Sequence, residues 1–347
     1  HVDITAEYDN MLANDNIRKI KISARELEQE LSKLQQESGY PYIVNIDTVN
    51  KANPVDGVIS MSNLCSEILQ VQTPSVLNDD QTYSTLGTDV ACNLGSTNVM
   101  NMMTSGADFG SSIESMVRAL TFISETSNLD SVPTVRKGNN EMRAIGLGAM
   151  GLHSFLAKNH IHYDSKAAVD FTSVYFMLLN YYTLVASNTL AVERQATFKD
   201  FDKSAYADGS YFDKYLNHDY FAAVPNEIQE LFAGIAVPGP AEWAALKEKV
   251  MQGGLYNSYR MAVAPNGSIS YINDCSSSIH PIVNRIEERQ EKKVGKIYYP
   301  AAGLSTDTIP YYKSAYDTDM RAVIDVYAAA TEHVDQGLSM TLFMRST

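Results

Sequence analysis

Short extended runs alternate with amphipathic helical segments along this chain, and this alternation is the feature that most restricts its fold. Apolar and β-branched residues bounded by turn residues predict extended segments over residues 42–46, 90–96 and 339–344. Apolar residues at helical spacing predict helices over residues 111–129 and 317–336. Strands and helices that alternate in this way are typical of an α/β fold.

The composition is that of a globular protein with a large core. The chain has 347 residues, of which 45% are hydrophobic and 20% charged. It contains no apolar run of roughly 18 residues, so we expect no membrane span. Its first residues lack an initiator Met and the basic and apolar regions of a signal peptide. We therefore expect a cytoplasmic protein, and a chain that is cut from a longer one.

The charge balance is strongly acidic, with a formal net charge of −14 at pH 7. A nucleic-acid-binding protein would usually carry a basic stripe, and the densest basic stretch, residues 291–296, is better explained as a solvated loop. Nucleic acid is therefore not an expected partner. An anionic ligand would have to be bound by local groups against an unfavourable overall field.

The chain contains three cysteines, Cys65, Cys92 and Cys275. No Cys-x-x-Cys motif occurs and no Cys/His spacing suits zinc, so we expect no metal site. In a cytoplasmic protein the thiols are reduced, and a functional cysteine acts through its reactivity.

The segment Met-Ser-Asn-Leu-Cys-Ser-Glu, residues 61–67, holds a compact set of chemical groups. If the segment is extended, Asn63, Cys65 and Glu67 project to one side. Cys65 could then exchange an electron or hydrogen atom, Glu67 could take a proton, and Asn63 could orient a hydroxyl. The alternative is a buried structural cysteine between polar turn residues.

Two glycine-containing motifs are candidates for phosphate binding. Residues 264–270, Ala-Pro-Asn-Gly-Ser-Ile-Ser, could open a helix whose free N–H groups bind phosphate without Lys or Arg, although an ordinary capped helix start has the same pattern. Gly146, Gly148 and Gly151 match a dinucleotide-binding pattern, but no good strand precedes them. Tight helix packing explains these glycines better, and we reject a dinucleotide site.

Taken together, the motifs resemble the catalytic large (α) subunit of class I ribonucleotide reductases, most closely the class Ib type. The matching segments occur in the family's order, at residues 62–67, 91–96, 145–148, 264–270 and 276–281. The resemblance implies a ten-stranded α/β barrel whose central finger loop carries the reactive cysteine. Residues 1–347 would form one partial catalytic barrel domain, without the N-terminal part and the C-terminal tail of the subunit.

The resemblance implies the reduction of ribonucleoside diphosphates to 2′-deoxyribonucleoside diphosphates by thiyl-radical chemistry. Cys65 would be the thiyl radical that abstracts the 3′-hydrogen, Glu67 would accept the 3′-hydroxyl proton, and Asn63 would hold the hydroxyls. Cys92 would be one of two thiols that supply the electrons and end as a disulfide. The implied substrate contacts are Asn63, Leu64, Cys65, Ser66 and Glu67, with Pro265, Asn266, Gly267, Ser268 and Ile269 around the diphosphate.

The resemblance also implies partners. A radical-generating β subunit with a dimetal centre (Mn or Fe) and a tyrosyl radical would supply the radical, and a glutaredoxin- or thioredoxin-like protein would supply electrons. An α homodimer is expected, with nucleotide effectors at a site outside this segment. We expect no cofactor bound to this chain itself and no association with a membrane.

The sequence departs from the family pattern at both ends. The family's other reductive cysteine lies upstream of the Cys65 motif, and its relay tyrosines lie beyond Thr347. Cys275 is therefore not assigned the missing thiol role, and Tyr311 and Tyr312 are expected to pack rather than to relay electrons. Two alternatives stay open: a non-catalytic fragment or split half that needs a complementary chain, and a transferase that uses Cys65 as nucleophile. No histidine lies near Cys65 in sequence to activate it.

Overall fold

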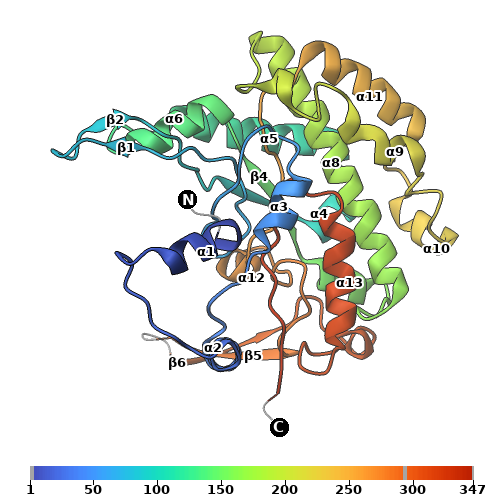
Figure 1. Cartoon of the computed structure of the whole chain (residues 1–347). Coiled ribbons are helices and arrows are strands. Elements are labelled where there is room, and N and C mark those ends of the chain that lie inside the picture. Colours follow the sequence, from blue (N-terminus) through green and yellow to red (C-terminus); the bar gives the residue numbers. More distant parts are fainter. Residues whose placement is uncertain (1–3, 292–294, 346–347) are drawn as a thin grey trace. The chain divides into compact units, whose positions relative to one another are not determined.

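The computed structural model describes residues 4–291 and 295–345, and the chain divides into two units, residues 1–46 and 47–347 (Figure 1). The first unit contains α1 (Ile4–Ala13) and α2 (Ala24–Ser38). The hydroxyl of Ser23 caps the start of α2, and Gly39 ends it with a left-handed φ of 76°. Neither helix buries a residue.

The strand predicted over residues 42–46 is wrong. Residues 42–45 are irregular, and Ile46 begins α3 (Ile46–Ala52). Tyr42 and Ile43 remain 42% and 65% exposed. A short apolar run becomes a strand only when a neighbouring strand pairs with it, and here no such pairing forms.

The second unit mixes helices and short strands, which confirms the predicted α/β class. After α3, its elements are β1 (Val76–Leu77), β2 (Tyr83–Thr85), β3 (Leu94–Asn98), α4 (Val99–Thr104), α5 (Phe109–Thr126), α6 (Pro133–Met142), β4 (Gly146–Met150), α7 (Leu152–Lys158), α8 (Lys166–Arg194), α9 (Asp213–Asn217), α10 (Asn226–Gln229), α11 (Pro240–Gly253), α12 (Gly267–Ile272), β5 (Ile286–Glu291), β6 (Gly295–Pro300) and α13 (Met320–Thr331) (Figure 1). Short 3₁₀ helices occupy Phe201–Lys203, Ser210–Phe212, Glu230–Phe232 and Ile309–Tyr311.

Antiparallel pairs join β1 to β2 and β5 to β6. In the stretch predicted as a solvated loop, residues 291–296, the prediction is wrong at Glu291, which ends β5, and at Gly295 and Lys296, which begin β6; residues 292–294 lie outside the described residues. Among the helices that are described, none is both long and apolar enough to cross a membrane.

Helices α5 and α13 form where the sequence predicts them, with ends that differ from the prediction. The first begins earlier than expected because the Asp108 carboxylate accepts a hydrogen bond from the Ser111 N–H at 2.7 Å and so caps the helix. The second begins after Asp319, which caps it in the same way. The predicted final strand is absent from the described residues of 339–344, and Leu338 forms only a single bridge.

A parallel run of chain segments organises the second unit. Strand β3 pairs with β4 in register from Leu94↔Gly146 to Asn98↔Met150. Parallel bridges continue the run from Leu147 to Met261 and from Val263 to Leu338. Every residue of β4 is buried, as expected for a parallel strand covered on both faces. Among the described residues, the strands form two-stranded pairs and single bridges, and they do not close into the ten-stranded barrel that the resemblance implies.

The glycines of β4 allow this close pairing. A Cβ placed on Gly148 would lie 2.3 Å from the carbonyl oxygen of Ala262. The expectation of tight packing at these glycines is confirmed, but a neighbouring strand segment makes the contact, not a helix. Gly146 and Gly148 lie in strand β4, not in the loop that the rejected dinucleotide site would need, and Gly151 follows the strand directly, before α7.

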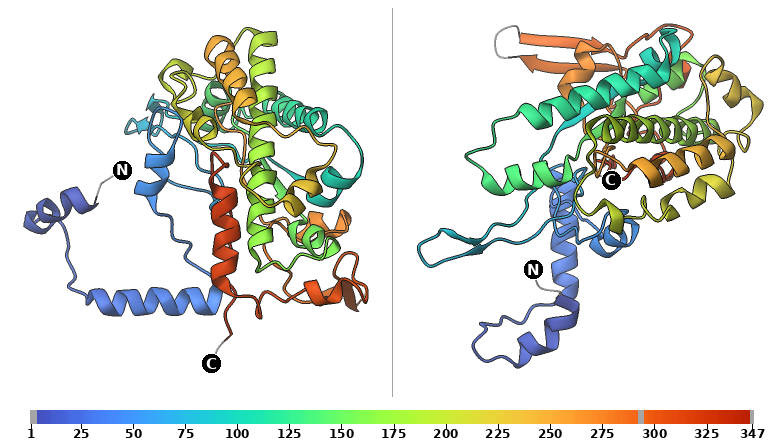
Figure 2. Two further views of the ribbon diagram at one scale, coloured as in Figure 1. Left: turned by 90° about the vertical axis from the view of Figure 1, so that its right-hand side faces the viewer. Right: turned by 90° about the horizontal axis from the view of Figure 1, so that it is seen from above.

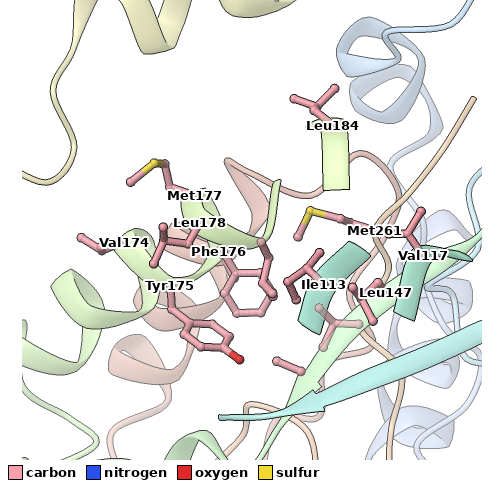
Figure 3. Close-up of a cluster of buried hydrophobic side chains, with 14 of the residues drawn as sticks. Ile113, Val117, Leu147, Val174, Tyr175, Phe176, Met177, Leu178, Leu184 and Met261 are labelled. Atoms are coloured by element: carbon pink, nitrogen blue, oxygen red, sulfur yellow. The ribbon is translucent and has the colours of Figure 1, made fainter. Parts of the chain in front are cut away.

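The core forms where helices cover this run. Helix α8 packs against α5, α11 and α13 (Figure 2). Side chains on consecutive positions of α8 are buried, so the helix is enclosed on nearly all sides. Figure 3 shows Ile113 and Val117 of α5 beside Leu147 of β4 and Met261, all of them fully buried.

A buried ion pair ties the run together. The Arg260 and Asp335 side chains are both 0% exposed, and their Nη2 and Oδ2 atoms lie 2.7 Å apart. The same carboxylate accepts hydrogen bonds from the backbone N–H groups of Arg260 and Met261. Asp335 therefore fixes the segment that follows α13 against the parallel run.

We expect the substitution Asp335→Ala to lower the free energy of unfolding by about 3–5 kcal/mol, because it leaves a buried guanidinium without its counter-charge. Urea unfolding followed by circular dichroism measures the loss. The control is Glu114→Ala, which removes an exposed partner of Arg118 and is expected to cost less than about 0.5 kcal/mol. Equal losses for the two variants would contradict this role.

Candidate functional site

The segment around Cys65 is a turn, and the extended conformation predicted for it is wrong. The Ser66 N–H donates to the Asn63 carbonyl at 3.1 Å, and Ser66 has a left-handed φ of 65°. The side-chain oxygen of Asn63 accepts a hydrogen bond from the Ile68 N–H at 3.1 Å and so stabilises the turn. Leu64, at the tip, is 74% exposed.

Cys65 and Glu67 are nevertheless close enough to interact. Burial raises the pKa of the Cys65 thiol above its ordinary value, and the negative charge of Glu67 raises it further. Glu67 is only 2% exposed, and its Oε2 has no hydrogen-bond partner among the described residues. A buried carboxylate oxygen without a partner is able to accept a proton or a hydroxyl hydrogen from a ligand.

Cys92 belongs to the same cluster. It is exposed and lies just before β3. Burial of its sulfur, then the charges of Glu67 and Cys65, raise the pKa of its thiol. Two free thiols therefore share one buried carboxylate. Asn63 lies in the same turn, but its side-chain oxygen is engaged with the backbone.

The second predicted region, residues 265–269, contains the start of α12, as expected. Asn266 immediately precedes the helix, accepts a hydrogen bond from the Ser96 hydroxyl at 3.2 Å and donates to the Ala149 carbonyl at 3.4 Å. These contacts anchor the helix start to β3 and β4. A Cβ on Gly267 would meet no atom within 4 Å, so the space beside the helix start is open. In the described part of the chain, no hydrogen bond or ion pair joins this region to the two thiols.

Cys275 is separate from the cluster. It is 9% exposed, and burial followed by the charge of Asp274 raises its pKa to about 11. A Cβ on Gly151 would lie 3.0 Å from the Cys275 Cβ, so the cysteine packs against the start of α7. Tyr312 is buried and Tyr311 stacks on His160, which agrees with the expected packing roles.

Sequence reasoning missed three residues at the base of the turn, Gln70, Gln336 and Gly337. The Gly337 N–H donates to the Glu67 carbonyl at 2.9 Å, and the Gln70 Nε2 donates to the Gln336 Oε1 at 2.9 Å. The only signal in the sequence is the Asp-Gln-Gly triplet at 335–337, which does not reveal a contact partner 266 residues away. Across the described ranges, no cluster of His, Cys, Asp and Glu could hold a metal ion.

Comparison with known proteins shows clear similarity along the whole chain. The family model described as ribonucleotide reductase, barrel domain, matches residues 1–347. The ribonucleoside-diphosphate reductase subunit alpha of Mycoplasma genitalium is 44% identical over 99% of this chain and 48% of its own length. The subunit alpha of Bacillus subtilis is 42% identical over 100% of this chain and 49% of its own length.

A second Bacillus subtilis protein, ribonucleoside-diphosphate reductase NrdEB subunit alpha, is 44% identical over 82% of this chain and 26% of its own length. The chain spans about half the length of the Mycoplasma and first Bacillus relatives.

The shared carboxylate generates a prediction. Replacing Glu67 with Gln removes a negative charge that raises the pKa of two thiols, so the thiolate fraction of Cys65 and Cys92 is expected to rise at pH 8. Alkylation by iodoacetamide, followed by peptide mass spectrometry, is expected to speed up about two- to tenfold at both cysteines.

Cys275 is the internal control, because burial and Asp274, not Glu67, raise its pKa. Its slow alkylation is expected to stay unchanged. A parallel rise at all three cysteines would indicate general loosening of the fold and would contradict a local electrostatic effect.

Proposed function

The chain belongs to the ribonucleotide reductase family, whose barrel domain it matches over residues 1–347, and from this premise we propose that it carries the thiols that reduce ribonucleoside diphosphates. The products are 2′-deoxyribonucleoside diphosphates. The observation that carries the proposal is the grouping of two thiols, Cys65 and Cys92, with the buried carboxylate of Glu67, where burial and this carboxylate raise the pKa of both thiols. Because the chain covers about half the length of these relatives, the proposed activity belongs to the complete subunit and not to these residues alone.

The electrostatics favour hydrogen-atom chemistry over nucleophilic attack. A nucleophilic cysteine needs a lowered pKa or an adjacent base, since the thiolate is the reactive form. Here burial and a carboxylate raise the pKa of both thiols, which keeps the S–H bond intact at neutral pH. An intact S–H is what hydrogen-atom transfer and thiol reduction require. This argues against the alternative of a transferase with Cys65 as nucleophile.

In the proposed mechanism, the Cys65 thiyl radical takes the hydrogen atom from C3′ of the ribose and becomes a thiol. Glu67 takes the 3′-hydroxyl proton, and the 2′-hydroxyl leaves as water with a proton from a reductive thiol. Cys92 and a second thiol together give up two protons and two electrons and form a disulfide; one proton goes to the leaving water and the other to C2′. The hydrogen returns from Cys65 to C3′, Glu67 returns its proton, and the thiyl radical is restored.

The proposal needs a second reductive thiol besides Cys92. Cys275 does not fit, because it is buried against Gly151 and its electrostatic neighbour is Asp274. The second thiol must therefore come from a part of the enzyme outside these residues. We propose the class Ib type, an α homodimer with effector sites elsewhere, and a glutaredoxin- or thioredoxin-like reductant. A partner β subunit with a dimetal tyrosyl-radical centre would supply the radical.

Substrate binding is proposed at two places. The Asn63 side-chain oxygen is engaged with the Ile68 N–H, which leaves its Nδ2 to donate to a ribose hydroxyl. The turn residues 64–67 complete the ribose contacts. Residues 265–269 at the start of α12 would hold the diphosphate through backbone N–H groups and the Ser268 hydroxyl. This mode of binding needs no Lys or Arg, which suits an acidic chain.

The first functional prediction concerns Cys65. In the complete enzyme with its radical subunit and reductant, Cys65→Ala is expected to abolish deoxyribonucleotide formation while leaving substrate affinity largely intact. Product analysis by chromatography and equilibrium binding of a ribonucleoside diphosphate measure the two effects. Cys275→Ala is the matched control and is expected to retain activity. Deoxyribonucleotide formation by the Cys65→Ala variant would contradict the proposal.

The second prediction concerns Cys92. The variant Cys92→Ser is expected to stop repeated turnover with the protein reductant, because a serine cannot form the disulfide. The measurement is the number of product molecules formed per active site over time. Continued cycling at the unsubstituted rate would count against a reductive role for Cys92.

A further inference from the structure

Two buried amides lie at the base of the Cys65 turn. Gln70 and Gln336 are 3% and 7% exposed, and the Gln70 Nε2 donates to the Gln336 Oε1 at 2.9 Å. The Gln336 Nε2 in turn donates to the carbonyls of Ile145 at 2.8 Å and Met261 at 3.3 Å. The pair therefore connects the turn to two neighbouring segments of the parallel run.

The amide of Gln70 also reaches the second thiol segment. Its Nε2 lies 3.4 Å from the carbonyl oxygen of Ala91, the residue before Cys92. One side chain thus contacts Gln336 and the backbone beside Cys92, and it stands three positions after Glu67 in the chain.

Gly337 allows the backbone of its own segment to approach the backbone of the Cys65 turn closely. Its N–H donates to the Glu67 carbonyl, and a Cβ on it would lie 2.5 Å from the Ser66 oxygen and 3.0 Å from the Glu67 Cα. Only glycine permits this approach. Asp335, two positions earlier, is held by the buried pair with Arg260. The segment 335–337 is therefore a fixed support for the turn.

The other hydrogen bonds of the turn do not fix its position relative to distant segments of the chain. Its side-chain hydrogen bonds are local, from the Ser62 hydroxyl to the Ile68 carbonyl and from the Ile68 N–H to Asn63. Leu64 and Met61 project outward, with exposures of 74% and 61%. Among the hydrogen bonds of the described residues 61–70, those that reach distant segments are made by the Gln70 side chain and the Glu67 carbonyl.

We propose that Gln70 and Gln336 are positioning residues that set the placement of Cys65 and Glu67 relative to Cys92. They do not touch substrate. They act by holding the turn against the parallel run through the chain of hydrogen bonds from Ala91 through Gln70 and Gln336 to Met261. The effect on turnover rests on the proposed function, whereas the effect on thiol geometry does not.

The test uses Gln70→Met, Gln336→Met and the double variant in the complete enzyme. Methionine keeps an unbranched side chain of similar length and removes the amide. Asn188→Leu is the matched control: Asn188 is a buried amide that donates to the carbonyls of Lys249 and Gly254, away from the turn. Three quantities are measured: the thermal midpoint, the alkylation rates of Cys65 and Cys92, and kcat and KM.

We expect each glutamine variant to change the alkylation rate of Cys65 at least about fivefold, and to lower kcat about 10- to 100-fold with KM within about threefold, because misplaced reacting groups lose rate rather than affinity. The double variant is expected to lose no more than about threefold further, since the two amides act as one unit. Asn188→Leu is expected to lower the thermal midpoint comparably and to leave alkylation and kcat unchanged.

Unchanged alkylation and kcat in the glutamine variants, at a stability loss equal to that of Asn188→Leu, would overturn the positioning role. If Gln336→Met fails to fold, the result for Gln70→Met alone tests the positioning role. This variant removes the hydrogen bond between the two glutamines and leaves both hydrogen bonds from Gln336 to the backbone in place. Altered alkylation in an enzyme whose unsubstituted form does not reduce ribonucleotides would support positioning and refute the proposed function.

Discussion

The buried pair of Arg260 and Asp335 is the constraint on which the rest of the second unit depends. Removing two charges from water is costly unless they meet each other with good geometry and satisfy their remaining hydrogen bonds. Here the carboxylate also accepts two backbone N–H groups, so it is satisfied only when the chain after α13 lies against residues 260–261. That placement positions Gly337, whose N–H donates a hydrogen bond to the carbonyl of Glu67.

The site that results places two free thiols near one buried carboxylate. Burial raises the pKa of the Cys65 and Cys92 thiols, and the negative charge of the buried Glu67 raises it further, so both thiols stay protonated at neutral pH. Such an environment is poor for a nucleophilic thiolate and suitable for the transfer of hydrogen atoms. In the proposed function, the start of α12 binds the anionic diphosphate through neutral N–H groups, without a cluster of basic side chains.

Much of the fold could be predicted from the sequence where local signals decide the structure. The α/β class, the extents of α5 and α13 to within a few residues, and the start of α12 all follow from apolar spacing, caps and glycine. The turn at residues 63–66 could not be predicted, because one side-chain bond from Asn63 to the backbone replaces the extended conformation. The hydrogen bond between Gln70 and Gln336 could not be predicted either, since it joins residues far apart in the chain and no local pattern marks it.

The central claim is that Cys65 exchanges a hydrogen atom with C3′ of the ribose. The most direct measurement is the fate of deuterium in a ribonucleoside diphosphate labelled at C3′, followed by mass spectrometry of the product together with the competitive isotope effect on kcat/KM. The account predicts a primary isotope effect and retention of the label at C3′ of the deoxyribonucleotide. The absence of an isotope effect, or complete loss of the label to water, would contradict it.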